Sequence, residues 1–293
     1  MISKILLSGA AMAALIIPVA AIAQEDGEAR GGPAGNASDR PATVFDGDFL
    51  SIGIGAGVGP SYSGSNDYVL FPLPVVQASV GGIDINPRPA GLAVDFVPDS
   101  DDGVSFDLGI AGRLRSDRAD QIEDPVVASL GELDRAVEVG PTASIKFPGL
   151  LNPYDSLSVS LDAAWDVAGA HDGMTVSPRV TYFTPLSRGA ASSLSLGASF
   201  VDDDFAEYYY GVSPAQSATS GLPAFTAEGG LESLGANLLL AFDLDGDVTN
   251  GGLSLVVIGG YSRLMGDAER TPLTSERGSA DQFLGGLGVG YTF

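Results

Sequence analysis

The stretch Phe283-Leu-Gly-Gly-Leu-Gly-Val-Gly-Tyr-Thr-Phe293 alternates with a period of two residues. Counting back in twos from Phe293, one face carries Tyr291, Val289, Leu287 and Phe283, and the opposite face carries mostly glycine. Successive side chains of a β-strand point to opposite faces, so this period predicts a strand. One face of that strand is apolar, and the other is nearly bare of side chains.

The same alternation recurs along most of the chain. Gly53, Gly55, Gly57 and Gly59 alternate with apolar residues, and similar segments of about 9–14 residues follow. Strands that cross a membrane need about 9–11 residues, whereas strands of soluble domains are mostly about 5–6 residues long. The eleven segments are 49–59, 68–80, 90–97, 104–113, 136–147, 156–168, 174–185, 191–201, 231–243, 251–265 and 281–293.

Short and long connections alternate between these segments, as in barrels with brief turns at one end and extended loops at the other. The short connections include 148–155, 185–190 and 243–252, and the long ones are 116–134, 202–222 and 266–281. We therefore predict an all-β fold, a transmembrane antiparallel β-barrel of about 12 strands, with 10 as the alternative. A twelfth, weak strand would lie at 83–87 or within 205–228.

The amino-acid composition excludes several classes of protein and of site. The formal net charge is −23, which repels phosphate backbones and argues against a nucleic-acid partner. Only 17% of the residues are charged and the mean hydropathy is +0.22, so the chain is not an acidic disordered protein. Cysteine is absent and His171 is the single histidine, which removes thiolate zinc sites and multi-histidine metal centres.

Residues 1–23 are predicted to be a secretory signal peptide. Lys4 is followed by an apolar stretch, and the small residues Ala21 and Ala23 precede a cleavage point at Gln24. The alternative is a retained membrane anchor. Residues 24–44 are then a flexible periplasmic leader, and the barrel occupies 45–293.

Three motifs that could carry chemistry have plainer interpretations. The glycines that begin at Gly53 lack the following helix of a dinucleotide loop. The segment that begins at Asp243 has Val248 and Ser254 where a calcium loop has Gly and Glu. His171 lies in a predicted loop beside Asp172, with no Gly-x-Ser-x-Gly elbow anywhere in the sequence. We therefore predict no catalytic residues, no metal ligands and no cofactor.

Aromatic residues stand near the predicted strand ends, where we expect a girdle at the lipid–water interface. These are Tyr182, Phe183, Phe200, Tyr208 to Tyr210 and Phe242. The final segment resembles the signal that the outer-membrane barrel-assembly machinery reads. The residues that would carry that signal are Leu287, Val289, Tyr291 and Phe293.

The chain also resembles the MltA-interacting protein family, called MipA/OmpV, over roughly 49–293. The resemblance rests on the order and spacing of several short pieces. These are Gly55-x-Gly57-x-Gly59-Pro60-Ser-Tyr62-Ser-Gly64-Ser65, Asp67-Tyr68, Phe71-Pro-Leu-Pro74, Glu138-Val-Gly140-Pro141, His171-Asp-Gly173, Tyr209-Tyr-Gly-Val-Ser213, Ser220-Gly-Leu-Pro223, Gly229-Gly-Leu231, Tyr261-Ser-Arg-Leu264-x-Gly266-Asp267-Ala268, Gly278-Ser, Asp281-Gln282 and Tyr291-Thr-Phe293.

That resemblance implies a non-enzymatic barrel in the Gram-negative outer membrane, surrounded by lipid and lipopolysaccharide. It implies a scaffold that joins a lytic transglycosylase to a murein synthase. The alternative is a narrow porin-like channel, or an osmotically regulated uptake or adhesion protein. In a channel, the acidic field of the whole chain predicts a preference for cations.

Overall fold

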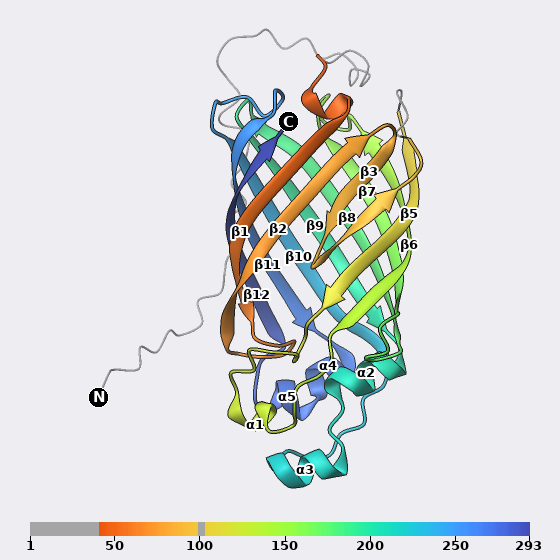
Figure 1. Cartoon of the computed structure of the whole chain (residues 1–293), viewed down its shortest axis with the longest axis vertical. Coiled ribbons are helices and arrows are strands. Elements are labelled where there is room, and N and C mark those ends of the chain that lie inside the picture. The colour runs from red at the N-terminus through yellow and green to blue at the C-terminus, as the bar shows by residue number, and fades with distance from the viewer. Residues whose placement is uncertain (1–40, 99–102) are drawn as a thin grey trace, which may run out of the picture. The chain divides into compact units, whose positions relative to one another are not determined.

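The computed structural model describes residues 41–98 and 103–293, and it confirms a closed barrel of twelve antiparallel strands (Figure 1). Each strand pairs with its neighbours in sequence, and β1 pairs with β12 to close the barrel. The strands are β1 (Phe49–Pro60), β2 (Tyr68–Val80), β3 (Ile83–Arg88), β4 (Gly91–Asp95), β5 (Ser105–Arg115), β6 (Ala136–Pro148), β7 (Ser156–Asp166), β8 (Met174–Ser187), β9 (Ala190–Val201), β10 (Gly230–Asp243), β11 (Gly252–Leu264) and β12 (Asp281–Thr292).

The weak twelfth strand is β3, close to the predicted 83–87. The other candidate region, within 205–228, forms helices instead. A short 3-10 helix at Val44–Asp46 precedes β1. The predicted signal peptide, its cleavage residues and most of the leader lie outside the described residues.

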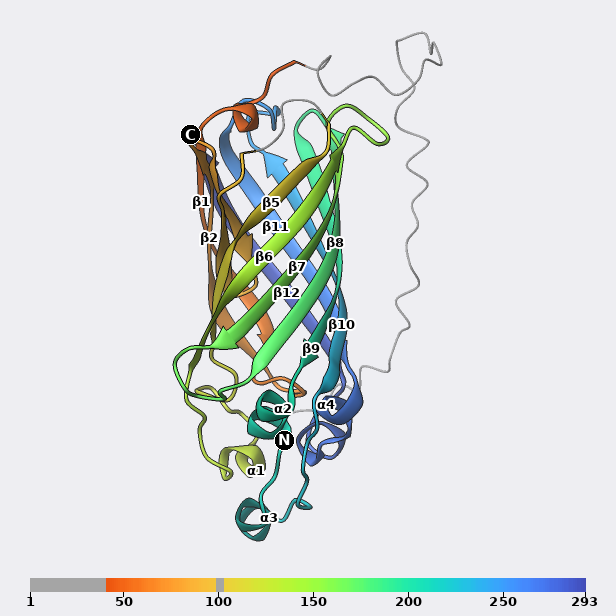
Figure 2. The ribbon, with the colours of Figure 1, turned by 90° about the vertical axis from the view of Figure 1, so that its right-hand side faces the viewer.

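The two ends of the barrel differ (Figures 1 and 2). One end has short turns and the C-terminus, and the other carries the three long connections, whose helices lie together over the mouth. The helices are α1 (Pro125–Ala128), α2 (Asp203–Tyr210), α3 (Pro214–Ser220), α4 (Gly266–Arg270) and α5 (Pro272–Ser275). We call these three connections the cap. Among the described residues, no helix has the length and apolar character to cross a membrane.

Alternation sorts each strand into an apolar outside and an inner face. On β1, Ile54 is 69% exposed to the exterior, while the glycines face inward. Gly57 shows why: a Cβ built there would lie 2.7 Å from the ring of Phe71, its partner on β2. The glycine face of β1 is therefore crowded, and it lets inward side chains of β2 lie close to β1.

One part of the predicted aromatic girdle is wrong. Tyr208, Tyr209 and Tyr210 belong to α2, and the last two are almost fully buried in the cap. The capping carboxylate of Asp202 starts a helix here, and the tyrosines pack with Phe205 against the barrel mouth. Phe183, Phe200 and Phe242 do lie on exposed outer positions of their strands.

Candidate functional site

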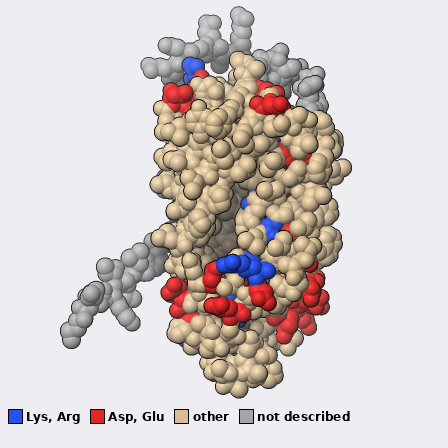
Figure 3. All heavy atoms as spheres, in the orientation of Figure 1, with Lys and Arg blue, Asp and Glu red and all other residues tan. Residues whose placement is uncertain are grey.

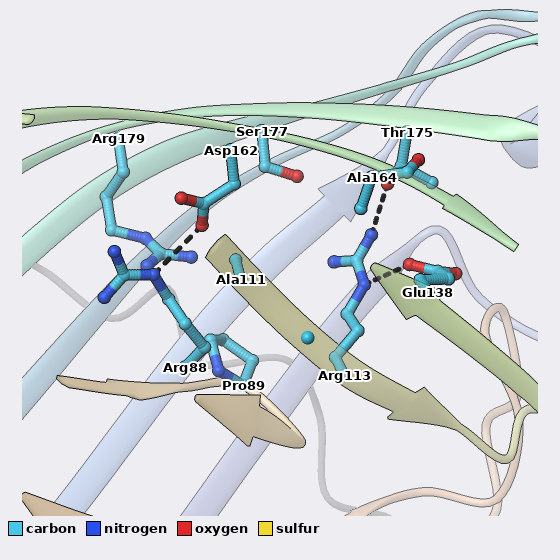
Figure 4. Close-up of a pocket in the computed structure, with 11 residues that line it drawn as sticks. Arg88, Pro89, Ala111, Arg113, Glu138, Asp162, Ala164, Thr175, Ser177 and Arg179 are labelled. Atoms are coloured by element: carbon cyan, nitrogen blue, oxygen red, sulfur yellow. Dashed lines mark hydrogen bonds and ion pairs between the residues drawn. The ribbon is translucent and has the colours of Figure 1, made fainter. Parts of the chain in front are cut away.

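Charged side chains from β3 and β5–β8 converge inside the barrel (Figure 4). Each sits at an inward position of its strand, because a charge on the outer face would meet lipid. We call this group the arginine cluster. It comprises Arg88, Arg113, Arg115, Glu138, Asp162 and Arg179.

Glu138 on β6 is the buried centre of one half of the cluster. Its side chain has no exposed surface, and its carboxylate accepts hydrogen bonds from the Nε atoms of Arg113 and Arg115, the latter at 2.6 Å. Arg113 also donates from Nη2 to Thr175 Oγ1 at 2.6 Å. A buried carboxylate is tolerable only when it is paired in this way, so Glu138 is a structural counter-ion.

His171 is a further partner of Glu138. Its Nδ1 accepts the backbone N–H of Gly173 at 3.0 Å, which places the ring proton on Nε2, 3.3 Å from Glu138 Oε1. The ring also packs edge-on against Phe205 of α2, with 5.0 Å between centroids. His171, predicted to be a loop residue without a catalytic role, is therefore a buried link between the arginine cluster and the cap. Its contacts need no catalytic role.

The cap contacts the cluster through an arginine as well. The guanidinium of Arg115 lies over the ring of Phe205, 4.7 Å from its centroid, and over Tyr209 at 5.6 Å. Such cation–π contacts contribute about 1–2 kcal/mol when they are shielded from water. Side chains of the cap at the long-loop mouth thus touch the cluster directly.

Asp162 on β7 organises the other half. Arg88 Nε lies 3.0 Å from its carboxylate, and the hydroxyl of Thr142 donates to it at 2.5 Å. Arg88 comes from the end of β3 and reaches across the lumen to β7. The short hairpin β3–β4 is thereby tied to the far wall.

Arg179 on β8 has no such partner. Within the described part of the chain, its guanidinium makes no hydrogen bond or ion pair, although it lines the same cavity as Arg88 and Asp162 (Figure 4). Three guanidinium groups and two carboxylates line this cavity, a net charge of +1. The sign of the charge in this cavity is therefore opposite to that of the whole chain.

The cavity within the cluster is small, about 30 Å³. That volume accommodates about two water molecules. Two carboxylate oxygens need similar room. We call this cavity the constriction, and it has space for one small charged group.

The opposite side of the lumen is apolar. Phe71 and Leu73 of β2 lie over the glycine faces of β1 and β12, where a Cβ at Gly57 or Gly286 would meet them at about 2.7 Å. By the same alternation Val69 faces inward. We call Val69, Phe71 and Leu73 the apolar strip.

The wall between these two sides is incomplete. β2 pairs with β1 along its whole length, from Phe49↔Ser79 to Pro60↔Tyr68, but with β3 only from Ala78↔Ile85 to Val80↔Ile83. The β3–β4 hairpin turns back at Pro89 and leaves much of the β2 edge without a partner strand. Figure 3 shows a hollow in the wall on this face, with basic side chains visible in it.

Prolines suit the two free edges. Pro72 and Pro74 lie on β2 beside the hollow, and Pro87 lies on the part of β3 that does not pair with β2. Proline has no N–H to donate, so it is confined to edge strands in sheets. The positions of these prolines in the sequence therefore fit the unpaired strand edges that border the opening.

The cap has its own anchor, at Asp124. Its carboxylate caps α1 through the amides of Val126 and Val127 and accepts from Arg277 at 2.7 Å. Burial alone would raise the pKa of Asp124, but the hydrogen bonds from Arg277 and the two amides outweigh it and lower that pKa below its usual value. Burial raises the pKa of Tyr62 to about 12, and the negative charge of Asp124 adds to this shift.

Apart from His171, the structure places the other candidate residues singled out in the sequence away from the cluster. Leu287, Val289, Tyr291 and Phe293 all lie exposed on the outer face at β12. The Asp243 turn is stabilised internally by backbone amides, including those of Asp245 and Gly246 at 2.9 Å. Among the residues described, no group of three His, Cys, Asp or Glu side chains could hold a metal ion.

The arginine cluster was not predicted from the sequence, although the sequence carries a signal for it. Arg113 and Arg115 flank the outward-facing Leu114, so both must face inward in a membrane-crossing strand. The same alternation of inward and outward side chains, here called parity, places Glu138, Asp162 and Arg179 inward. It could not show which strands bring them together, because that depends on barrel closure and stagger.

The model of the family described as MltA-interacting protein MipA matches residues 52–293, nearly the whole barrel. The chain belongs to this family. The resemblance drawn from the short sequence pieces is thereby confirmed. No curated protein matches the sequence.

Several solved structures of outer-membrane proteins are similar to this chain. An outer-membrane channel of Pseudomonas putida F1 is 14% identical with a TM-score of 0.43, over 91% of this chain and 100% of that one. OprD of Pseudomonas aeruginosa is 11% identical with a TM-score of 0.31, over 89% and 97%. The toluene transporter TodX of Pseudomonas putida is 9% identical with a TM-score of 0.32, over 89% and 92%. These scores are too low to transfer a function or a substrate to this MipA-family barrel.

Proposed function

We propose that this barrel is a non-enzymatic outer-membrane protein that binds small organic anions in its lumen and lets them pass. The observation that carries the proposal is Arg179, a guanidinium that lines the constriction and makes no hydrogen bond or ion pair with the described residues, although Asp162 lies close enough to attract it. Arginine presents a planar fork of donors that matches a carboxylate. A solute anion would supply the partner that the protein does not.

Efflux of labelled lactate from vesicles that contain the folded barrel tests this proposal. At pH 8 lactate is ionised, and lactamide serves as a neutral molecule of similar size. We expect Arg179→Gln to slow lactate efflux at least threefold and to leave lactamide efflux unchanged. The matched control is Arg188→Gln, since Arg188 lies on an exposed turn and its side chain is 82% exposed. Equal lactate rates in the wild type and Arg179→Gln would refute the proposal.

A second function is favoured by the family description, MltA-interacting protein. We propose that the short-turn end faces the periplasm and holds a lytic transglycosylase, and with it a murein synthase, near the membrane. Such tethering raises the effective concentration of one enzyme near the other. The barrel would meet lipopolysaccharide around its wall and the barrel-assembly machinery during insertion.

Affinity capture from gently solubilised envelopes, followed by mass spectrometry, tests the scaffold. A transglycosylase or synthase should be enriched over an unrelated barrel. Asp245→Lys on a short turn should reduce the yield, and Asp204→Lys in the cap should not. Recovery of assembly factors and lipopolysaccharide alone would count against the scaffold.

A further inference from the structure

The opening in the wall joins two surfaces of different chemistry. On one side stands β2, whose inward apolar strip includes Phe71 and Leu73. On the other stands the hairpin end, where Arg88 reaches toward Asp162 and Arg179 lines the same cavity. A molecule in the opening therefore meets apolar side chains along one edge and guanidinium groups along the other.

We infer that amphipathic monocarboxylates move between the lumen and the surrounding lipid through this opening. This inference rests on the proposed anion-binding function and names its ligand class and its route. The carboxylate would lie on Arg179 and Arg88, and the apolar body would lie along Val69, Phe71 and Leu73.

The size of the constriction favours a carboxylate head. The cavity of about 30 Å³ accommodates about two water-sized groups. A carboxylate has two oxygens, whereas a phosphate monoester has three terminal oxygens and a higher charge. With a cavity charge of only +1, one negative charge is neutralised and two are not.

The outer rim of the opening suits lipid. Leu70 on the β2 edge is 72% exposed, and Leu92 on the hairpin is 42% exposed. Apolar side chains at the rim let an alkyl chain leave the bilayer without crossing a polar barrier. The free backbone edges that border the opening include Pro72, Pro74 and Pro87, which lack the N–H groups that lipid would leave unsatisfied.

The long-loop mouth is a poor route for such a molecule. The cap lies over it, and Phe205 and Tyr209 are each only 1% exposed. Their contacts with Arg115 and His171 would have to break for a large apolar body to pass. The opening in the wall demands no such rearrangement.

Electron paramagnetic resonance with a nitroxide-labelled stearic acid in vesicles of phosphatidylcholine tests the inference on the full chain. The methyl ester of the same probe reports ordinary contact of lipid with the outer wall. We expect the acid to show an immobilised fraction well above that of the ester. Arg179→Gln should reduce this excess at least fivefold, and Arg188→Gln should keep it.

The chain has no cysteine, so paired cysteines can close the opening selectively. A bis-maleimide bridge between Pro74→Cys and Ala90→Cys spans it. A bridge between Leu240→Cys and Val257→Cys, which are already partners on the outer face of β10 and β11, is the control. We expect the first bridge to abolish the excess and the second to preserve it.

The outcomes separate the two claims. The route through the wall is refuted if the excess immobilised fraction of the acid survives the Pro74–Ala90 bridge. It is also refuted if no such excess is seen while lactate efflux still depends on Arg179. In both cases the anion-binding function stands. If neither measurement depends on Arg179, both fail. Each variant is first checked for the gel-mobility shift of a folded barrel, and Arg179→Gln should pass because Arg179 has no described partner to leave unpaired.

Discussion

The two sides of the lumen solve the same packing problem in different ways. On the side of β1, β2 and β12, glycines make room for apolar side chains, and Phe71 rests on Gly57. On the side of β5–β8, arginines and carboxylates fill the interior and neutralise one another around Glu138 and Asp162. The first side depends on shape and the second on charge, so the two should respond differently to substitution, pH and solutes.

The charged side should suffer the largest loss of stability. Glu138→Gln removes the buried partner of both Arg113 and Arg115. Breaking a buried ion pair on one side costs ~3–5 kcal/mol. We expect a loss of that size in the free energy of unfolding, measured by urea titration in detergent micelles. Asp120→Asn breaks the exposed pair with Arg135 and should cost only ~0–1 kcal/mol.

The apolar side should respond to volume. Gly57→Val places side-chain atoms where the ring of Phe71 lies, and overpacking of this kind costs ~1–3 kcal/mol. The double variant Gly57→Val with Phe71→Ala should recover part of that loss, measured in the same urea titrations. Gly259→Ala is the control, because nothing lies within 4 Å of its added Cβ. Equal losses at Gly57 and Gly259 would contradict close packing on this side.

The cap should be the part that is sensitive to acid. The pKa of Asp124 is lowered in the folded state, so its contribution is present above the unfolded value of about 3.9 and is lost as pH falls through the folded pKa. Asp124→Ala should destabilise the cap by ~1 kcal/mol at neutral pH, the usual cost of losing a helix cap. Hydrogen exchange of the α1 amides measures both effects, at neutral pH for the variant and across pH 5 to 2 for the wild type. A flat profile in the wild type would contradict the assignment.

Arg179→Gln should have the smallest effect on stability, within about 0.5 kcal/mol, because no described partner is lost. A large loss in urea titrations would mean that Arg179 serves the fold. A small loss together with a changed response to anions would mean that it serves a solute.

The barrel fold could be predicted from local patterns in the sequence. Period-two alternation and strand length placed eleven segments, and the gap at 83–87 held the twelfth strand. The helices within 202–229 were missed because their tyrosines also suit a membrane interface. Burial under the cap, which only the tertiary structure reveals, decides between the two interpretations.

The site could be predicted only in part. Parity assigns Arg113, Glu138 and Arg179 to the lumen, yet their meeting depends on how the strands stagger around the barrel. The whole-chain charge of −23 differs in sign from this one cavity, where three arginines face two carboxylates, while many of the acids occupy loops and turns. The net charge of the whole chain therefore does not give the local charge around one cavity.

We expect the charged groups around the constriction, and not the net charge of the chain, to set which ions this barrel accepts. The most direct measurement is the reversal potential of the reconstituted barrel in a planar bilayer under a gradient of potassium chloride. We expect the sign of an anion-selective path in the wild type and a shift toward cation selectivity in Arg179→Gln. A cation-selective wild type with an unchanged Arg179→Gln variant would contradict it.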